Sequence, residues 1–429
     1  MGPSPEILTA VQALGCHAGA CPMHRTADSQ KPKTAREIGI MQGFPPPPEK
    51  RPTLDNWDLA PFNRWSFQNM RRLFPTADVR SGPAAAAPLP VALQDLSEVC
   101  FATGAGTRQS VGDWLWQSYT DGFLVLHGGA IVTEFYANDF HAEAAHLGQS
   151  VSKSVIGILA GILHGEGLLD LAAPLEEIVP ELAGTGYAGC TVDQALDMLS
   201  GVRFSEGYGL PGSDMTRVDI ASGWRPVRDG EIKPTIRDVI LSLPQERAHG
   251  LGFSYRSIET DVIAWALERV SGTDLSALLS DRIWRRLGCE QDGFFTVDDA
   301  GTALADGGFN ASLRDYARFG HMVLNGGRVG DDQIVPEAWI DGICTGADPS
   351  KFGAPYDVLS PQGAYRRFWW VHDPGRGVFM ARGVFGQLIF IDRSADVVIV
   401  KLSSWPDYLI PAFGLDAVQA CEAIVSALD

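Results

Sequence analysis

The sequence predicts an α/β protein in which a mainly helical lobe interrupts a body built around a sheet. Apolar strand patterns lie at 123–136 and at 387–400, and helical patterns occupy much of the chain between them. Strands near both ends around a helical middle are typical of an α/β body with an inserted lobe. We therefore expect the body over about 53–165 and 285–429, and the helical lobe over about 166–284.

The first 52 residues are predicted to form an extension of the body. Positions 45–48 are four consecutive prolines, which favour a stiff polyproline II segment. Trp57 and Phe67 are apolar anchors that indicate packing onto the body after Pro52. A zinc site at Cys16, Cys21 and His24 is the alternative use of this extension, but the spacing is tight and a second ligand pair is missing. We expect no metal and no cofactor.

The body begins with a predicted β-hairpin, in which two apolar runs flank His127-Gly128-Gly129. A helix follows from Ser150, where apolar residues recur at helical spacing, and it ends near Gly165. Later patterns predict helices near 191–199, 236–243 and 259–270, strands at 387–391 and 397–400, and a final helix at about 414–427.

Charge and composition narrow the classes of partner that the protein could bind. The chain has 34 Lys and Arg against 52 Asp and Glu, a formal net charge of −18, which disfavours nucleic acid and acidic membrane surfaces. The apolar run 155–163 is shorter than the ~20 residues that a bilayer requires. The sequence shows no secretory signal, and its seven cysteines fit reduced thiols. These features predict a soluble cytoplasmic protein.

Ser150 and Lys153 form a Ser-x-x-Lys motif where the helix is predicted to begin. Residues three apart share a helix face, so the hydroxyl and the amine can meet over one cleft. Free N–H groups at the helix start favour an oxyanion beside Ser150. Desolvation and nearby cationic potential would lower the pKa of Lys153, leaving a neutral amine to accept the serine proton. Alone, the motif equally fits an N-cap serine followed by a surface lysine.

Two further segments add polar groups to the same chemistry. Tyr255 and Ser257 precede a predicted helix, and a phenol beside an ammonium can relay a proton to a leaving group. The alternative is a buried tyrosine whose hydroxyl is satisfied locally. Gly383 and Gly386 flank Val384 at the start of an apolar strand, where a strand-edge N–H can be an oxyanion donor. The alternative there is a strand bulge.

Taken in order, these motifs resemble the serine β-lactamase and DD-peptidase superfamily, in its class C branch. Within it, the chain is most similar to 6-aminohexanoate-dimer (nylon oligomer) hydrolases and family VIII esterases. The resemblance covers roughly residues 53–428 and includes segments 63–68, 119–127, 181–189 and 400–406. It implies an antiparallel sheet flanked by helices, and it allows a homodimer.

The resemblance also implies residue roles in an acyl-enzyme mechanism. Ser150 would be the nucleophile, Lys153 the activating base and Tyr255 the proton relay. The N–H groups of Ser150 and Val384 would form the oxyanion hole, where one donor typically contributes ~3 kcal/mol. Water would then hydrolyse the ester intermediate.

Positions on the substrate side match the nylon oligomer hydrolases less cleanly. Tyr208 would hydrogen-bond the scissile amide, and Asp219 would pair with the ammonium of an ω-amino acid oligomer, unless it is only a solvated loop carboxylate. Trp224 stands at a matching place. Asp306 stands where the nylon oligomer hydrolases carry a small polar residue, so the substrate selectivity of this chain is left open. The remaining candidates that would contact substrate are Ser257 and Phe385, the latter standing where close relatives often carry His.

The third motif departs from the β-lactamase pattern. Ala381-Arg382-Gly383 stands in place of Lys-Thr-Gly, so the lysine that holds the β-lactam carboxylate is missing, and Arg382 can substitute only in part. We therefore expect amide or ester hydrolysis with little β-lactamase activity.

Three alternative functions remain for this chain. They are a promiscuous short-chain carboxylesterase, a non-catalytic penicillin-binding-like module that recognises a ligand, and an α/β-hydrolase that would use His372 as its base.

Overall fold

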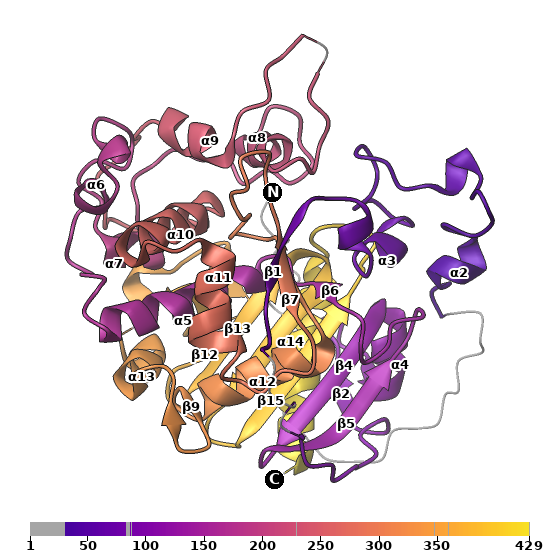
Figure 1. Cartoon of the computed structure of the whole chain (residues 1–429). Helices are drawn as coiled ribbons and strands as arrows, with labels where there is room; N and C mark the ends of the chain where they lie inside the picture. The colour runs from indigo at the N-terminus through magenta and orange to yellow at the C-terminus, as the bar shows by residue number, and fades with distance from the viewer. Residues whose placement is uncertain are drawn as a thin grey trace.

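The computed structural model describes residues 31–82, 86, 88–228, 230–346, 348–358 and 360–428. Cys16, Cys21 and His24, the residues of the alternative zinc site, lie outside the described residues. Within them, a seven-stranded antiparallel sheet runs through the molecule in the order β11-β12-β13-β14-β15-β4-β5 (Figure 1). Its strands are β11 Ala364–Arg366, β12 Trp369–Asp373, β13 Val378–Gly383, β14 Gln387–Asp392, β15 Val397–Ser403, β4 Thr120–His127 and β5 Ala130–Tyr136.

The predicted strand pairs are confirmed, and the structure shows how the two ends of the chain meet. β4 pairs with β5 as a hairpin, and β14 pairs with β15. β15 then pairs antiparallel with β4, with Val400 opposite Leu124. This central pairing joins the early hairpin to the late strands in one sheet.

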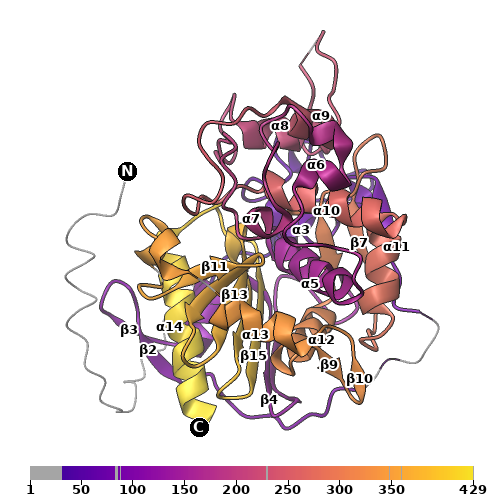
Figure 2. The ribbon, with the colours of Figure 1, turned by 90° about the vertical axis from the view of Figure 1, so that its left-hand side faces the viewer.

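Alternation along the strands divides the core into two layers. Phe123 and Val125 of β4 pack in one layer with α4 (Val111–Gln117) and α14 (Pro411–Leu428), whereas Leu124 and Leu126 pack in the other layer. Successive strand side chains point to opposite faces, so an apolar run is buried on both sides. Figure 2 shows α14 on one side of the sheet, with α5 (Val151–Gly165) and α12 (Leu313–Leu324) on the other.

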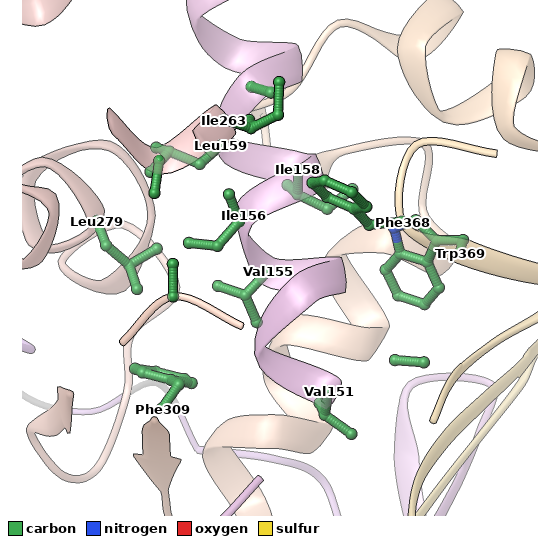
Figure 3. Close-up of a cluster of buried hydrophobic side chains, with 14 of the residues drawn as sticks. Val151, Val155, Ile156, Ile158, Leu159, Ile263, Leu279, Phe309, Phe368 and Trp369 are labelled. Atoms are coloured by element: carbon green, nitrogen blue, oxygen red, sulfur yellow. The ribbon is translucent and has the colours of Figure 1, made fainter. Parts of the chain in front are cut away.

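α5 is the central helix of the second layer. Its apolar residues are buried all around, among them Val151, Val155 and Leu159 (Figure 3). Phe309 and Trp369 approach it from outside the helical lobe, and Ile263 and Leu279 from helices within it. Burial on all sides fixes the direction of α5 and therefore the position of the residues at its start.

Helices fill the middle of the chain and cover one end of α5 (Figures 1 and 2). The helices predicted near 191–199, 236–243 and 259–270 are confirmed, as is the C-terminal helix. The helices of this region are α6 Leu175–Ile178, α7 Val192–Leu196, α8 Asp214–Ala221, α9 Ile236–Ser242, α10 Ile258–Ser271 and α11 Leu275–Leu279.

Shorter elements complete the described part of the chain. A four-stranded sheet has the order β1-β7-β8-β6, formed by β1 Thr76–Val79, β7 Gly293–Thr296, β8 Phe309–Ala311 and β6 His146–Leu147. The others are β2 Cys100–Ala102, β3 Arg108–Ser110, β9 Arg328–Val329, β10 Asp332–Gln333, α2 Ala35–Ile38, α3 Asn63–Ser66 and α13 Glu337–Thr345. Across the described ranges, no helix has the length and apolarity to cross a membrane.

Candidate active site

Ser150 and Lys153 meet at the start of α5. The chain leaves β6 at Leu147 and turns through Gln149, whose φ is 48°, so that Ser150 becomes the N-cap of α5. Lys153 Nζ donates a hydrogen bond of 2.8 Å to Ser150 Oγ and one of 2.6 Å to the backbone oxygen of Asp306. Lys153 is only 1% exposed. The geometry therefore provides a serine hydroxyl in direct contact with a buried amine.

Gly148 is required for this turn because the backbone there lies against a tyrosine. A Cβ at Gly148 would come within 2.4 Å of the Tyr316 hydroxyl. The Gly148 N–H also donates to the oxygen of Phe309 in the neighbouring strand β8. This close approach places Ser150 between the four-stranded sheet, to which β6 and β8 belong, and α5.

The predicted lowering of the Lys153 pKa is wrong. Burial alone would lower the pKa of Lys153. The neighbouring Tyr255, Asp306, Glu206 and Asp261 outweigh burial and raise this pKa. The fold surrounds the amine with acidic groups and not with the cationic potential expected from the sequence. Lys153 is therefore an ammonium at neutral pH.

Tyr255 lies beside this ammonium in the loop before α10. Lys153 Nζ is 5.3 Å from the centroid of the Tyr255 ring, and the ring stacks on Trp370 at 5.5 Å. Burial raises the pKa of Tyr255, and this effect exceeds the opposing effect of Lys153. Tyr255 is thus a neutral phenol, which is the form that can donate a proton.

Val384 lies next to Ser150 because Gly383 permits close contact between β13 and the start of α5. A Cβ at Gly383 would come within 2.7 Å of the Gly148 oxygen and 3.0 Å of the Ser150 nitrogen. A side chain at position 383 would separate the two segments. The backbone of β13 and the N-terminus of α5 therefore meet at the wall where an oxyanion could bind.

A cavity of about 340 Å³ opens beside these residues. Its catalytic end includes Ser150, Tyr255, Val384 and Tyr208, all of which the sequence singled out. The rest of its lining includes residues of β14 and of the C-terminal segment that are mainly apolar or small, and we refer to this part of the lining as the apolar arm. The residues of this arm are Leu388, Trp405, Leu409, Gly414, Ala417 and Val418.

Five of the predicted substrate residues do not line this cavity. Ser257 instead holds Glu206, donating from both its hydroxyl and its N–H to the carboxylate. Phe385 packs between Phe67 and Tyr408, with ring centroids 5.0 and 4.6 Å away. The other three, Asp219, Trp224 and Asp306, are buried behind the catalytic end.

The buried carboxyls behind the site differ in their partners. Asp306 is 2% exposed and neither carboxylate oxygen has a hydrogen-bond partner among the described residues; burial raises its pKa to about 6 against the opposing effect of Lys153. Burial also raises the pKa of Asp219 well above its usual range, although Arg225 opposes the rise. Burial therefore favours the protonated form of Asp219.

Tyr208 lines the cavity, but its hydroxyl is already engaged. It donates to Glu206 Oε1 at 2.7 Å, and its ring stacks on Tyr408 at 5.7 Å. Hydrogen bonding to the scissile amide would require this hydroxyl to turn away from Glu206. Glu206, which Ser257 and Tyr208 hold in place, is therefore the residue that the helical lobe presents to the cavity beside Tyr208.

Sequence reasoning missed Glu206, Tyr356 and Trp370 as cavity residues. Glu206 follows the Gly201–Ser205 segment and precedes Tyr208, so its position in a matched segment was the available signal. Tyr356 and Trp370 lie far along the chain and carry no local motif. The part of the chain that the structure describes holds no group of three or more His, Cys, Asp or Glu suited to a metal ion.

The family model of β-lactamase matches residues 117–415. The chain belongs to the β-lactamase family. It is 38% identical to 6-aminohexanoate-dimer hydrolase of Paenarthrobacter ureafaciens over 358 residues, which cover 83% of this chain and 89% of that protein. These findings confirm the predicted resemblance and fold, and they make this family member a serine hydrolase.

Two other similarities agree with this family membership. Esterase EstB of Burkholderia gladioli is 30% identical over 156 residues, covering 35% of this chain and 38% of that protein. A solved structure from Bacillus anthracis, assigned as a 6-aminohexanoate-dimer hydrolase, superposes with a TM-score of 0.80 at 28% identity and covers 88% of this chain and 96% of that one. The α/β-hydrolase alternative is excluded, since the fold differs and His372 bonds Ser360 and faces Glu422.

Proposed function

We propose that this β-lactamase family member hydrolyses small linear amides or esters through an acyl-Ser150 intermediate. The observation that carries the proposal is the 2.8 Å hydrogen bond between Lys153 Nζ and Ser150 Oγ at one end of a cavity. The 38% identity to a 6-aminohexanoate-dimer hydrolase supports a linear amide as the substrate class.

The reaction begins with attack of Ser150 Oγ on the substrate carbonyl. Lys153 takes the hydroxyl proton in its neutral form, and the N–H groups of Ser150 and Val384 bind the carbonyl oxygen as it becomes negative. Tyr255 donates its phenol proton to the leaving amine or alcohol and is reprotonated from Lys153. Water then attacks the acyl ester, and Lys153 takes its proton and passes it to Ser150 Oγ as the acyl C–O bond breaks. This step releases the acid and restores both the serine hydroxyl and the neutral amine.

A second candidate is a short-chain carboxylesterase with weak amidase activity. The apolar arm of the cavity and the partial identity to Esterase EstB favour it. Hydrolysis of the 6-aminohexanoate dimer measured beside 4-nitrophenyl butyrate separates the two candidates. Turnover of the ester alone would overturn the amide assignment and leave the acyl-serine mechanism in place.

Labelling with a fluorophosphonate tests the mechanism directly. We expect mass spectrometry to find the label on Ser150, and we expect Lys153→Ala to slow labelling by about 10² to 10⁴-fold because the base is lost. His372→Ala is the matched control and should label at the rate of the unchanged protein. An unlabelled Ser150 in folded protein would favour a module that only recognises a ligand.

A further inference from the structure

The loop that carries Tyr255 is held by a segment from a later part of the chain. This segment, residues 348–358, lies between α13 and β11, and we refer to it as the clamp segment. The Phe253 N–H donates to the Lys351 oxygen at 3.0 Å, and the Tyr255 N–H donates to the Tyr356 hydroxyl at 3.2 Å. The clamp segment therefore provides both hydrogen-bond acceptors on one side of the loop.

The N–H groups of this loop point to alternate sides. Those of Phe253 and Tyr255 face the clamp segment, whereas the Ser254 N–H between them donates to the Met198 oxygen at 3.2 Å. This alternation is typical of extended backbone. The backbone of Tyr255 depends on a side chain, that of Tyr356, for its bond to the clamp segment, so a single substitution can remove this bond and leave the backbone unchanged.

Aromatic rings extend the same contact into the cavity. The Tyr356 ring packs edge-on against Phe253 with 4.8 Å between the centroids, and it lies 6.0 Å from Trp370, the ring on which Tyr255 stacks. Tyr356, Tyr255 and Trp370 all line the cavity. Because these rings come from separate segments and pack on one another, the position of the Tyr255 ring is linked to that of Tyr356.

A proton donor must lie at the leaving group to be effective. General acid catalysis requires the donor within hydrogen-bond reach of the atom that receives the proton, and a misplacement of ~1 Å can cost ~10²-fold in rate. Ser150 and Lys153 are fixed by α5 and contact each other directly, so their geometry does not depend on the clamp segment. Loss of the bond to Tyr255 would thus displace the proton donor and leave the nucleophile and the base in place.

We propose that Tyr356 is a positioning residue whose hydroxyl and ring hold Tyr255 where its phenol can protonate the leaving group. The inference rests on the proposed function and adds to it a residue that acts through Tyr255. Substrates whose leaving group must be protonated depend on this contact, whereas substrates that release a stable anion do not.

Two esters with the same acyl group test this assignment. The alcohol of ethyl butyrate requires a proton to leave, whereas 4-nitrophenyl butyrate releases a stable phenolate. Tyr356→Phe keeps the ring and removes the acceptor of the Tyr255 N–H. We expect this change to lower kcat/KM about tenfold for ethyl butyrate and less than about twofold for 4-nitrophenyl butyrate. Tyr255→Phe should show the same selectivity with a larger loss.

Tyr136→Phe is the matched control. It removes a hydroxyl that donates to Glu134 outside the cavity, and it should leave the ratio of the two kcat/KM values unchanged. Thermal unfolding verifies that each variant is folded. An unchanged ratio in Tyr356→Phe, including an equal loss for both esters as expected from a loosened fold, would overturn the inference. Failure of Ser150 to react with fluorophosphonate is a separate result and would overturn the proposed function.

Discussion

At the scale of single residues, the base of the proposed reaction is controlled by acidic groups from several elements. Lys153 on α5 is surrounded by Tyr255 and Glu206 from loops of the helical lobe, Asp261 on α10 and Asp306 from the loop before β8. Asp261 Oδ1 accepts the N–H of Ala305 and thereby holds the loop whose Asp306 oxygen binds Lys153. Together these groups favour the ammonium form of Lys153.

We expect Asp306→Asn to shift the activity of the enzyme toward lower pH. The carboxylate of Asp306 is ionised above its pKa of about 6 and contributes to the raised pKa of Lys153. Removing this charge lowers the pKa of Lys153, so the neutral amine forms at lower pH and the acidic limb of kcat/KM moves down. Ester hydrolysis at pH 7, expressed relative to the maximum, should rise several-fold.

The measurement is the pH profile of kcat/KM with 4-nitrophenyl butyrate. Asp299→Asn serves as the control, since Asp299 is an exposed partner of Lys233. Among the described residues, the two carboxylate oxygens of Asp306 have no hydrogen-bond partner, so an amide replaces the carboxylate without breaking a bond. An acidic limb unchanged by Asp306→Asn would show that this carboxylate does not influence the base.

The sequence indicates residues that are neighbours along one helix and misses those brought together by the fold. The contact of Ser150 with Lys153 follows from a spacing of three residues at a helix start. The cavity positions of Glu206, Tyr356 and Trp370 depend on packing between distant segments, which no local pattern records. The wrong direction for the Lys153 pKa has the same origin, because its acidic neighbours come from other elements.

At the scale of elements, long apolar runs were predictable and short or mixed strands were not. The runs at 387–391 and 397–400 are buried on both faces, which gives them a continuous apolar pattern. β11 and β12 contain arginine, tryptophan and histidine, and the strands of the small sheet have only two to four residues. Such segments acquire their strand conformation from pairing with neighbours.

α14 has a second role besides covering the sheet. Its residues Gly414, Ala417 and Val418 are spaced by three and four positions, so they share one helix face, and all three line the cavity arm. Small side chains on this face leave the space that the arm occupies. A substrate chain that enters the arm would meet this face of the C-terminal helix.

We expect Ala417→Leu to shorten the apolar arm and to select against long acyl chains. The added side chain displaces at least two methylene groups of a hexanoyl ester, at about 0.8 kcal/mol each, which lowers kcat/KM about tenfold relative to the acetyl ester. Steady-state kinetics with 4-nitrophenyl hexanoate and acetate measure this ratio. Ala412→Leu changes an exposed position of the same helix and should preserve it; a ratio equally preserved in Ala417→Leu would mean that hexanoyl chains avoid the arm.

At the scale of the whole molecule, three distant segments are joined beside the cavity. Asp58 lies in the N-terminal part, Arg225 in the helical lobe and Tyr408 in the loop between β15 and α14. Arg225 donates to Asp58 and, at 2.8 Å, to the Tyr408 hydroxyl, which itself donates to Asp58 at 2.7 Å. Tyr408 stacks on Tyr208, so this junction also supports the lobe side of the cavity.

The junction predicts that Asp58→Ala reduces both stability and substrate binding. Arg225 and Asp58 are largely buried, and removing one partner of a buried ion pair typically costs 3–5 kcal/mol, so urea unfolding should show a loss of about 3 kcal/mol. KM should rise more than kcat falls, because Tyr408 and Tyr208 lose support while Ser150 and Lys153 keep their contact.

Asp55→Ala, at an exposed position three residues earlier, controls for the loss of a charge. Equal stability and equal KM in the two variants would show that the N-terminal segment lies beside the cavity without supporting it.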